Sequence, residues 1–152
     1  MHTNTHKRRL EAMEKISELL GKVLYDFTEI QPRLGTLKQL IQMEKDEDRT
    51  KFLNRFHTAR LEDYNQSLRK LGDARESAYI YTSKETYEKL REFCSHCSYS
   101  INLYCSRIVE EHVSEGHYQR VNDDFDSSCI KMTMERDLIV DAIKLEMHSK
   151  FL

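Results

Sequence analysis

The stretch "EFCSHCSYSINLYCSRIVEEH" (residues 92–112) holds the residues most capable of chemistry in this 152-residue chain. It contains three of the chain's four cysteines, two histidines and an arginine. Thiolates and imidazoles bind zinc, Cys-x-x-Cys pairs occur in redox proteins, and an arginine with a histidine is suited to acting on a phosphate. These residue types therefore leave three kinds of chemistry open, in addition to simple burial in a core.

The spacing of Cys94 and Cys97 favours burial. Both cysteines belong to a row with alternating steps of three and four residues, which is one face of a helix. The row consists of Tyr87, Leu90, Cys94, Cys97, Ile101, Tyr104 and Ile108. Free cysteine behaves as a small hydrophobic residue and is among the most frequently buried types. We therefore expect Cys94 and Cys97 in a helical core, with no metal ligands and no cofactor.

A zinc site and a redox pair are the alternatives for the same cysteines. Zinc-binding Cys-x-x-Cys pairs usually lie on a tight turn, often beside a glycine, whereas this pair lies in mid-helix with no glycine near it. Cys105 is rotated away from the row, and Cys129 must come from another helix. A redox thiolate is stabilised at a helix N-terminus, a position that Cys94 does not have. The pattern therefore favours the core interpretation over both alternatives.

The end of this stretch, "RIVEEH", places Arg107 and His112 on a helix with four residues between them. This Arg-x4-His pair resembles the motif of HEPN-type ribonucleases, which are small all-helical dimers. The resemblance covers these two residues and the helical class. It implies that Arg107 and His112 lie in a dimer cleft and act on the scissile phosphate of RNA, with Glu111 as a neighbour. Under this alternative the chain is a metal-independent ribonuclease with RNA as its partner.

Apolar residues at helical spacing predict the elements that carry these side chains. The first row runs from Met13 to Ile30 and continues in the same phase beyond Pro32. Because proline lacks an N–H and crowds the preceding turn, we expect one helix that is kinked near Pro32 and ends near Glu44. A second row predicts a helix over about residues 48–80.

Capping signals delimit the remaining two helices. Thr82, followed three residues later by Glu85, forms a capping-box pattern that predicts the start of the third helix. This helix is expected to end near Glu115, with Gly116 in the left-handed conformation that closes many helices. The fourth helix is predicted over about residues 118–150.

The composition supports an all-α fold. Four glycines and one proline imply few turns, and no stretch alternates with the period of two typical of strands. An apolar content of 39% with a charged content of 33% suits long helices that have one apolar and one solvated face. Short connections force neighbouring helices to run antiparallel. We therefore predict a single domain over residues 1–152, an elongated up-down-up-down four-helix bundle with heptad-like, coiled-coil-type apolar rows.

Charge and hydropathy exclude several classes of partner. The net charge of −2 provides no general attraction to nucleic acid or to acidic membranes. The basic start "MHTNTHKRR" is not followed by an apolar signal-peptide core, and no window reaches the roughly 18 apolar residues of a membrane helix. We therefore expect a cytoplasmic protein with free thiols and no membrane association.

The leading functional hypothesis is non-enzymatic. Heptad-like rows that include tyrosine are suited to recognition between helices. We expect the chain to bind another protein, or itself as a homodimer, through the row of the third helix. The expected interface residues are Tyr87, Leu90, Ile101, Tyr104 and Ile108. The pattern agrees equally well with the alternative that every row packs only the chain's own core.

Overall fold

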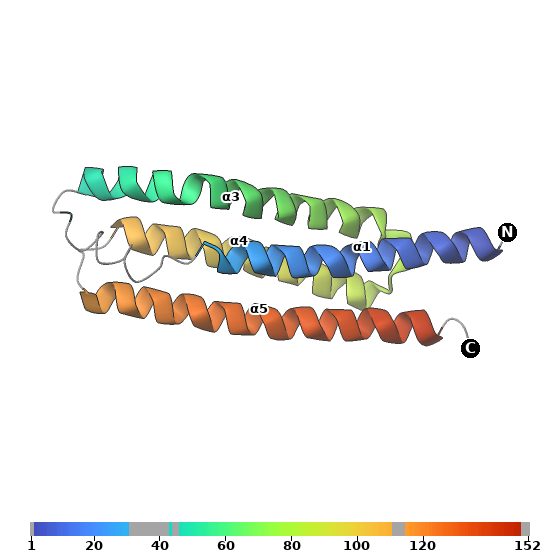
Figure 1. Cartoon of the computed structure of the whole chain (residues 1–152). Coiled ribbons are helices and arrows are strands. Elements are labelled where there is room, and N and C mark those ends of the chain that lie inside the picture. Colours follow the sequence, from blue (N-terminus) through green and yellow to red (C-terminus); the bar gives the residue numbers. More distant parts are fainter. Residues whose placement is uncertain (1, 31–42, 44–45, 111–114, 150–152) are drawn as a thin grey trace.

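The computed structural model describes residues 2–30, 43, 46–110 and 115–149. Over these ranges the chain forms the helices α1 (His2–Thr28), α3 (Asp46–Ser77), α4 (Lys84–Glu110) and α5 (Glu115–Ser149), with a 3-10 turn, η1 (Tyr79–Tyr81), between α3 and α4. The four helices run alternately in opposite directions along one long axis (Figure 1), and α1 and α4 each pack against both α3 and α5. The predicted up-down-up-down four-helix bundle is confirmed.

Several predicted helix boundaries differ from the structure. Helix α3 ends at Ser77, three residues earlier than predicted, and η1 then leads the chain into α4. Glu115 and Gly116 were expected to end the third helix, but both lie in the first turn of α5, and none of the described glycines has a positive φ. Glycine costs only about 1 kcal/mol relative to alanine in a helix, so it can be part of a helix as well as follow the end of one. The predicted kink near Pro32 and the end near Glu44 lie outside the described residues.

The core is centred on four aromatic side chains, one from each long helix. The Phe27 ring of α1 stacks on Phe125 of α5, with 4.5 Å between ring centroids and 2° between ring planes. Tyr64 of α3 lies 5.7 Å from Phe27, and Tyr104 of α4 lies 4.7 Å from Phe125. All four side chains are buried. This aromatic set therefore links all four helices at one level of the bundle.

The apolar rows supply the rest of the core. On α1, every member of the predicted row is buried, namely Met13, Ile16, Leu20, Val23, Phe27 and Ile30. On α5 the buried apolar residues are Val121, Phe125, Met132, Ile139 and Ile143. The second row is mixed: Tyr64 and Leu71 are buried, while Leu61 and Leu68 are half-buried against the core. Spacing of three and four thus identified residues of the inward face of α1 correctly but left out Leu19 and Leu24, which are also buried, and it identified the inward face of α3 in part.

A buried carboxylate joins α1 to α3. Asp26 is only 5% exposed, and its Oδ1 accepts a hydrogen bond from Lys22 Nζ at 2.8 Å. Its other oxygen accepts a hydrogen bond from the hydroxyl of Ser67, a buried residue of α3. A buried carboxylate is costly without partners, and of these two bonds only the one from Ser67 crosses between helices. That bond therefore favours one axial position of α1 relative to α3.

The N-terminus of α4 is capped by residues from two helices. The Ser83 Oγ accepts the Thr86 N–H at 3.1 Å, so Ser83 is the N-cap. The Glu146 carboxylate of α5 accepts the Thr86 hydroxyl at 2.7 Å and lies 3.3 Å from the Ser83 nitrogen, which donates to it. The predicted capping box of Thr82 and Glu85 is therefore wrong by one residue. A glutamate from the neighbouring helix takes the place of the local one.

Alanine at Glu146 should lower the free energy of unfolding by about 1–2 kcal/mol, because it removes the acceptor that pairs with the first turn of α4. Urea unfolding followed by circular dichroism measures the change. Glu85→Ala is the matched control, since Glu85 lies in the first turn of α4 itself, is exposed and pairs with the nearby Lys89 of the same helix at 3.3 Å. The control should change stability by less than about 0.5 kcal/mol. Equal effects of the two substitutions would contradict the capping role of Glu146.

Candidate functional site

The residues of the ribonuclease motif are only partly within the structure. Arg107 lies in the last two turns of α4, but its side chain is not among those described. Glu111 and His112 lie outside the described residues. The ribonuclease alternative therefore stays a prediction, which an RNA-cleavage assay comparing the chain with a His112→Ala variant would test.

The cysteines lie in or beside the core. Cys97 is completely buried next to Tyr64, Cys94 is half-buried beside Arg75, and Cys129 is half-buried on α5. All three are free thiols. Burial raises the pKa of each thiol, that of Cys129 to about 12, and the neighbouring Arg75 guanidinium only partly opposes the rise at Cys94. Such thiols are weak nucleophiles near neutral pH, because little thiolate is present.

Among the described residues, no group of three or more histidine, cysteine, aspartate or glutamate side chains is arranged to hold a metal ion. The Cys105 side chain lies outside the described side chains. The position of Cys97 in the core agrees with the helical spacing of the row on which it lies.

Three of the five predicted interface residues lie inside the bundle. Leu90, Ile101 and Tyr104 are buried in the core of the chain itself. Tyr87 is half-buried, and its hydroxyl donates a hydrogen bond to Glu76 of α3 at 2.7 Å. The fifth residue, Ile108, lies near the end of α4, and its side chain is not among those described. A partner that binds this folded bundle therefore does not meet Leu90, Ile101 or Tyr104.

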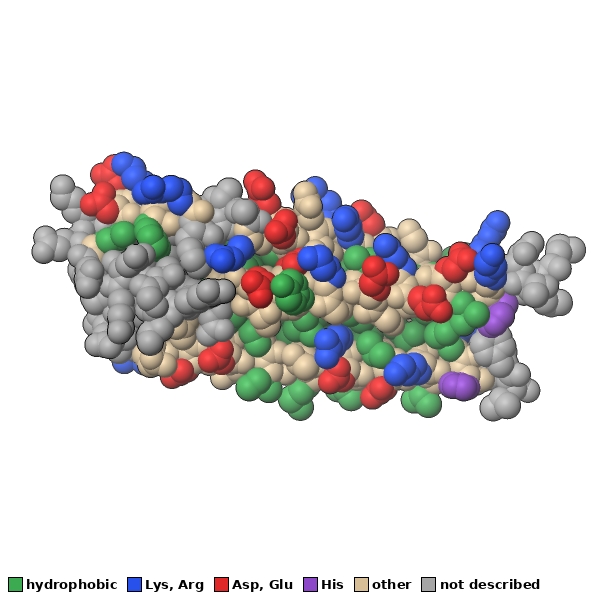
Figure 2. Space-filling model, viewed as in Figure 1, with side chains coloured by type: hydrophobic (Ala, Val, Ile, Leu, Met, Phe, Trp, Pro, Cys, Tyr) green, Lys and Arg blue, Asp and Glu red, His purple; other side chains and the backbone are tan. Residues whose placement is uncertain are grey.

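The outward side of α5 carries an apolar row that the sequence analysis did not single out. Its members are Ile130, Met134, Leu138 and Leu145, and each is between 63% and 71% exposed. Their spacing of four, four and seven residues places them on one side of the helix, opposite the buried side chains that face the core. Figure 2 shows hydrophobic side chains along the edge of the molecule that α5 forms. We call these four residues the α5 row.

A groove between α4 and α5 lies next to this row. A pocket of about 230 Å³ in the groove is lined by Lys89, Glu92 and His96 of α4 and by Glu135, Leu138 and Ile139 of α5. His96 Nδ1 lies 2.8 Å from Glu135 Oε2, so a hydrogen-bonded pair crosses the groove. Leu138 belongs to both the groove and the α5 row, and the two features therefore form one continuous surface.

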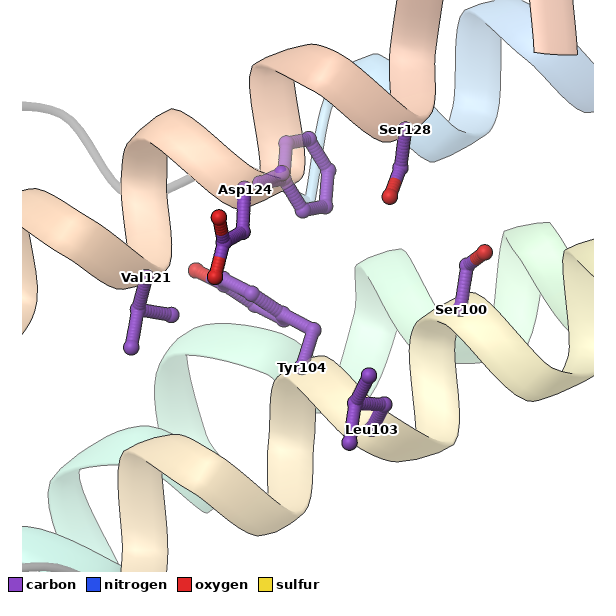
Figure 3. Close-up of a pocket in the computed structure, with 7 residues that line it drawn as sticks. Ser100, Leu103, Tyr104, Val121, Asp124 and Ser128 are labelled. Atoms are coloured by element: carbon purple, nitrogen blue, oxygen red, sulfur yellow. The ribbon is translucent and has the colours of Figure 1, made fainter. Parts of the chain in front are cut away.

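Farther along the same groove, a second hollow of about 30 Å³ has room for about one water molecule. It is lined by Ser100, Leu103, Tyr104, Val121, Asp124, Phe125 and Ser128. Figure 3 shows Tyr104 reaching from α4 toward α5, with Asp124 at the end of its ring. This part of the groove is thus closed beneath by the aromatic set of the core.

Helix α4 adds exposed apolar residues to this surface. Tyr99 is 67% exposed and Leu103 is 43% exposed. Tyr99 follows His96 by three residues and precedes Leu103 by four, so all three point to the same side of α4. We call the α5 row, these two residues of α4 and the groove between the helices the outer face. One signal in the sequence could have revealed it: apolar residues lie on both sides of a helix over residues 130–145.

Among the described residues, a further pocket is small and strongly charged. It measures about 250 Å³, lies between α1 and α3, and is lined by Lys22, Tyr25, Asp26, Glu29, Arg60 and Asp63. Small-molecule sites usually measure about 300–1,000 Å³ and are mainly apolar, so this pocket and the two in the groove favour no such ligand. None of the described helices is long and apolar enough to cross a membrane. The outer face is therefore the candidate site, and it is a surface rather than a cavity.

Comparisons of this chain with protein-family models, with curated proteins and with solved structures found no match.

Proposed function

We propose that this chain is a non-enzymatic helical-bundle protein that works by binding another protein, or a second copy of itself, through the outer face. The observation that carries the proposal is the α5 row. Single exposed apolar residues are normal on a protein surface, whereas a contiguous apolar patch usually marks an interaction site. Burying a leucine or methionine side chain contributes about 1.5–3 kcal/mol, so a partner that covers the row gains substantial free energy.

The structure beneath the outer face supports this role. Core residues of α4 and α5, including Tyr104 and Phe125, are held by packing across all four helices. The outward side chains therefore lie on rigid helices, and less conformational entropy is lost when they are buried by a partner. Recognition through apolar helix faces, with anchors spaced by three and four residues, is a common mode of protein binding.

The proposal predicts a particle larger than one chain in an extract of the host cell. Size exclusion of the extract should show the wild-type chain at an earlier elution position than a Leu138→Glu variant, which places a charge in the middle of the outer face. Ile80→Glu is the matched control, because Ile80 is 77% exposed but lies on η1, between α3 and α4. The control should elute with the wild type. Co-elution of the wild type with Leu138→Glu at the position of one 18.2 kDa chain would contradict the proposal.

A further inference from the structure

We infer that the occupant of the outer face is a second copy of this chain, packed α4–α5 pair against α4–α5 pair about a two-fold axis. The inference rests on the proposed function and specifies its partner. In such an isologous contact the same surface lies on both sides, so every exposed apolar residue of the face meets another apolar face.

The size of the outer face matches a dimer better than a single docked helix. The antiparallel overlap of α4 and α5 is about 40 Å long at 1.5 Å per residue, and two helices packed 8–10 Å apart give a face about 20 Å wide. The area is therefore about 800 Å², which is what each partner contributes to a standard stable interface. A helix about 10 Å wide lying in the groove would cover only about half of that width. The exposed residues extend beyond it, from Tyr99 on α4 to Ile130 on α5.

The charges of the face permit contact with its own copy. Lys89 and Glu92 line one part of the groove, and Asp124 lines the other. Lys131 is exposed on the same side of α5 as Asp124, because helical spacing places it there. Helical spacing also places the exposed residues Arg120, Asp123 and Asp141 on this side of α5, and Glu85, seven residues before Glu92, pairs with Lys89 at 3.3 Å on α4. The face therefore carries charges of both signs, and His96 hydrogen-bonds to Glu135 across the groove. Because charges of both signs are present, two copies can be aligned so that acidic residues of one lie opposite basic residues of the other.

Light scattering after size exclusion tests the inference on the purified full chain at micromolar concentration. The wild type should give twice the 18.2 kDa chain mass. Leu138→Glu and Met134→Glu should each weaken the dimer about 100-fold and give the mass of one chain, because each buries an unpaired carboxylate in the contact. Ile80→Glu should remain a dimer. The side chains at all three substituted positions are exposed, so circular dichroism of the variants should show unchanged helix content.

A second measurement does not depend on any substitution. Met134 is 63% exposed in the single chain, so dilute peroxide should oxidise it readily when the protein is monomeric. As the protein concentration rises into the dimer range, oxidation of Met134 should slow at least about tenfold, since the partner covers its sulfur. Peptide mapping by mass spectrometry measures the rate.

The outcomes separate this inference from the proposed function. A purified wild type that stays monomeric at high concentration overturns the inference. The proposed function still stands in that case if the host extract holds the chain in a larger particle that Leu138→Glu disrupts. A dimer that persists in both glutamate variants and leaves Met134 reactive also overturns the inference, because its contact then lies on another surface.

Discussion

Replacement of Phe27 by alanine is expected to lower the free energy of unfolding by about 3–5 kcal/mol. Phe27 is completely buried, stacks on Phe125 of α5 and contacts Tyr64 of α3 at the centre of the aromatic set. Truncation removes contacts to two other helices at once and leaves a cavity that rigid neighbouring helices cannot close. Since small domains have a total stability of about 5–15 kcal/mol, this change is a large fraction of it.

Urea unfolding of the purified protein measures the loss. Tyr25→Ala is the matched control, because Tyr25 lies on the same helix two residues away and is 60% exposed. Its ring lies under the Lys22 ammonium at 5.6 Å, an exposed contact whose loss should cost less than about 1 kcal/mol. Phe27→Leu should give an intermediate loss, since leucine refills part of the space. Similar losses for Phe27→Ala and Tyr25→Ala would show that the aromatic set does not hold the bundle together.

A rise in pH above about 9 is expected to destabilise the bundle steeply. Burial holds the pKa of the Cys97 thiol and of the Tyr64 hydroxyl well above their ordinary values, and raises that of Cys129 to about 12. In the unfolded chain these groups lose their protons near their ordinary pKa values, about 8.5 for cysteine and 10 for tyrosine. At a pH between the ordinary pKa values and the raised ones, the folded state therefore binds more protons than the unfolded state. Stability is complete below about pH 8.5 and falls as the pH rises, by up to about 1.4 kcal/mol per pH unit for each such group.

The free energy of unfolding, measured with urea at intervals from pH 7 to pH 11 under reducing conditions, tests this expectation. In Cys97→Ala the decline should be shallower by up to about 1.4 kcal/mol per pH unit, because the variant has no thiol to ionise at that site. Cys94→Ala is the comparison, since Cys94 is only half-buried and Arg75 opposes the rise of its pKa. Its effect on the decline should be smaller. Identical declines in the wild type and in Cys97→Ala would contradict a desolvated thiol at position 97.

The α4–α5 surface shows why a core row and a binding row are difficult to tell apart in a sequence. Tyr104 was predicted as an interface residue because tyrosine is frequent at interfaces, yet it packs against Phe125 inside the bundle. Leu138 and Met134 were not predicted as interface residues, although their exposed apolar side chains are available to a partner. The apolar character of a side chain determines that it prefers to leave water, but not whether its own chain or a partner covers it.

The sequence by itself determined the helical class, the antiparallel order of four long helices and the inward face of α1, because these follow from local periodicity and from the scarcity of turn residues. It also placed Cys97 on a core row. Helix ends were less certain, since a glycine such as Gly116 lowers helix stability without preventing a helix. Each of these properties depends on residues within a few turns of one another.

Only the tertiary structure decided the contacts between residues distant in the chain. Asp26 is buried because Ser67, 41 residues away, provides a hydrogen-bond donor, and Glu146 caps α4 from 60 residues beyond Thr86. Phe125 is the one apolar residue of the polar stretch "NDDFDSS" (residues 122–128), yet it stacks on Phe27 at the centre of the core. The relative rotation of packed helices sets which of two apolar sides of α5 faces inward, and that rotation minimises the free energy of the whole bundle rather than of any one helix.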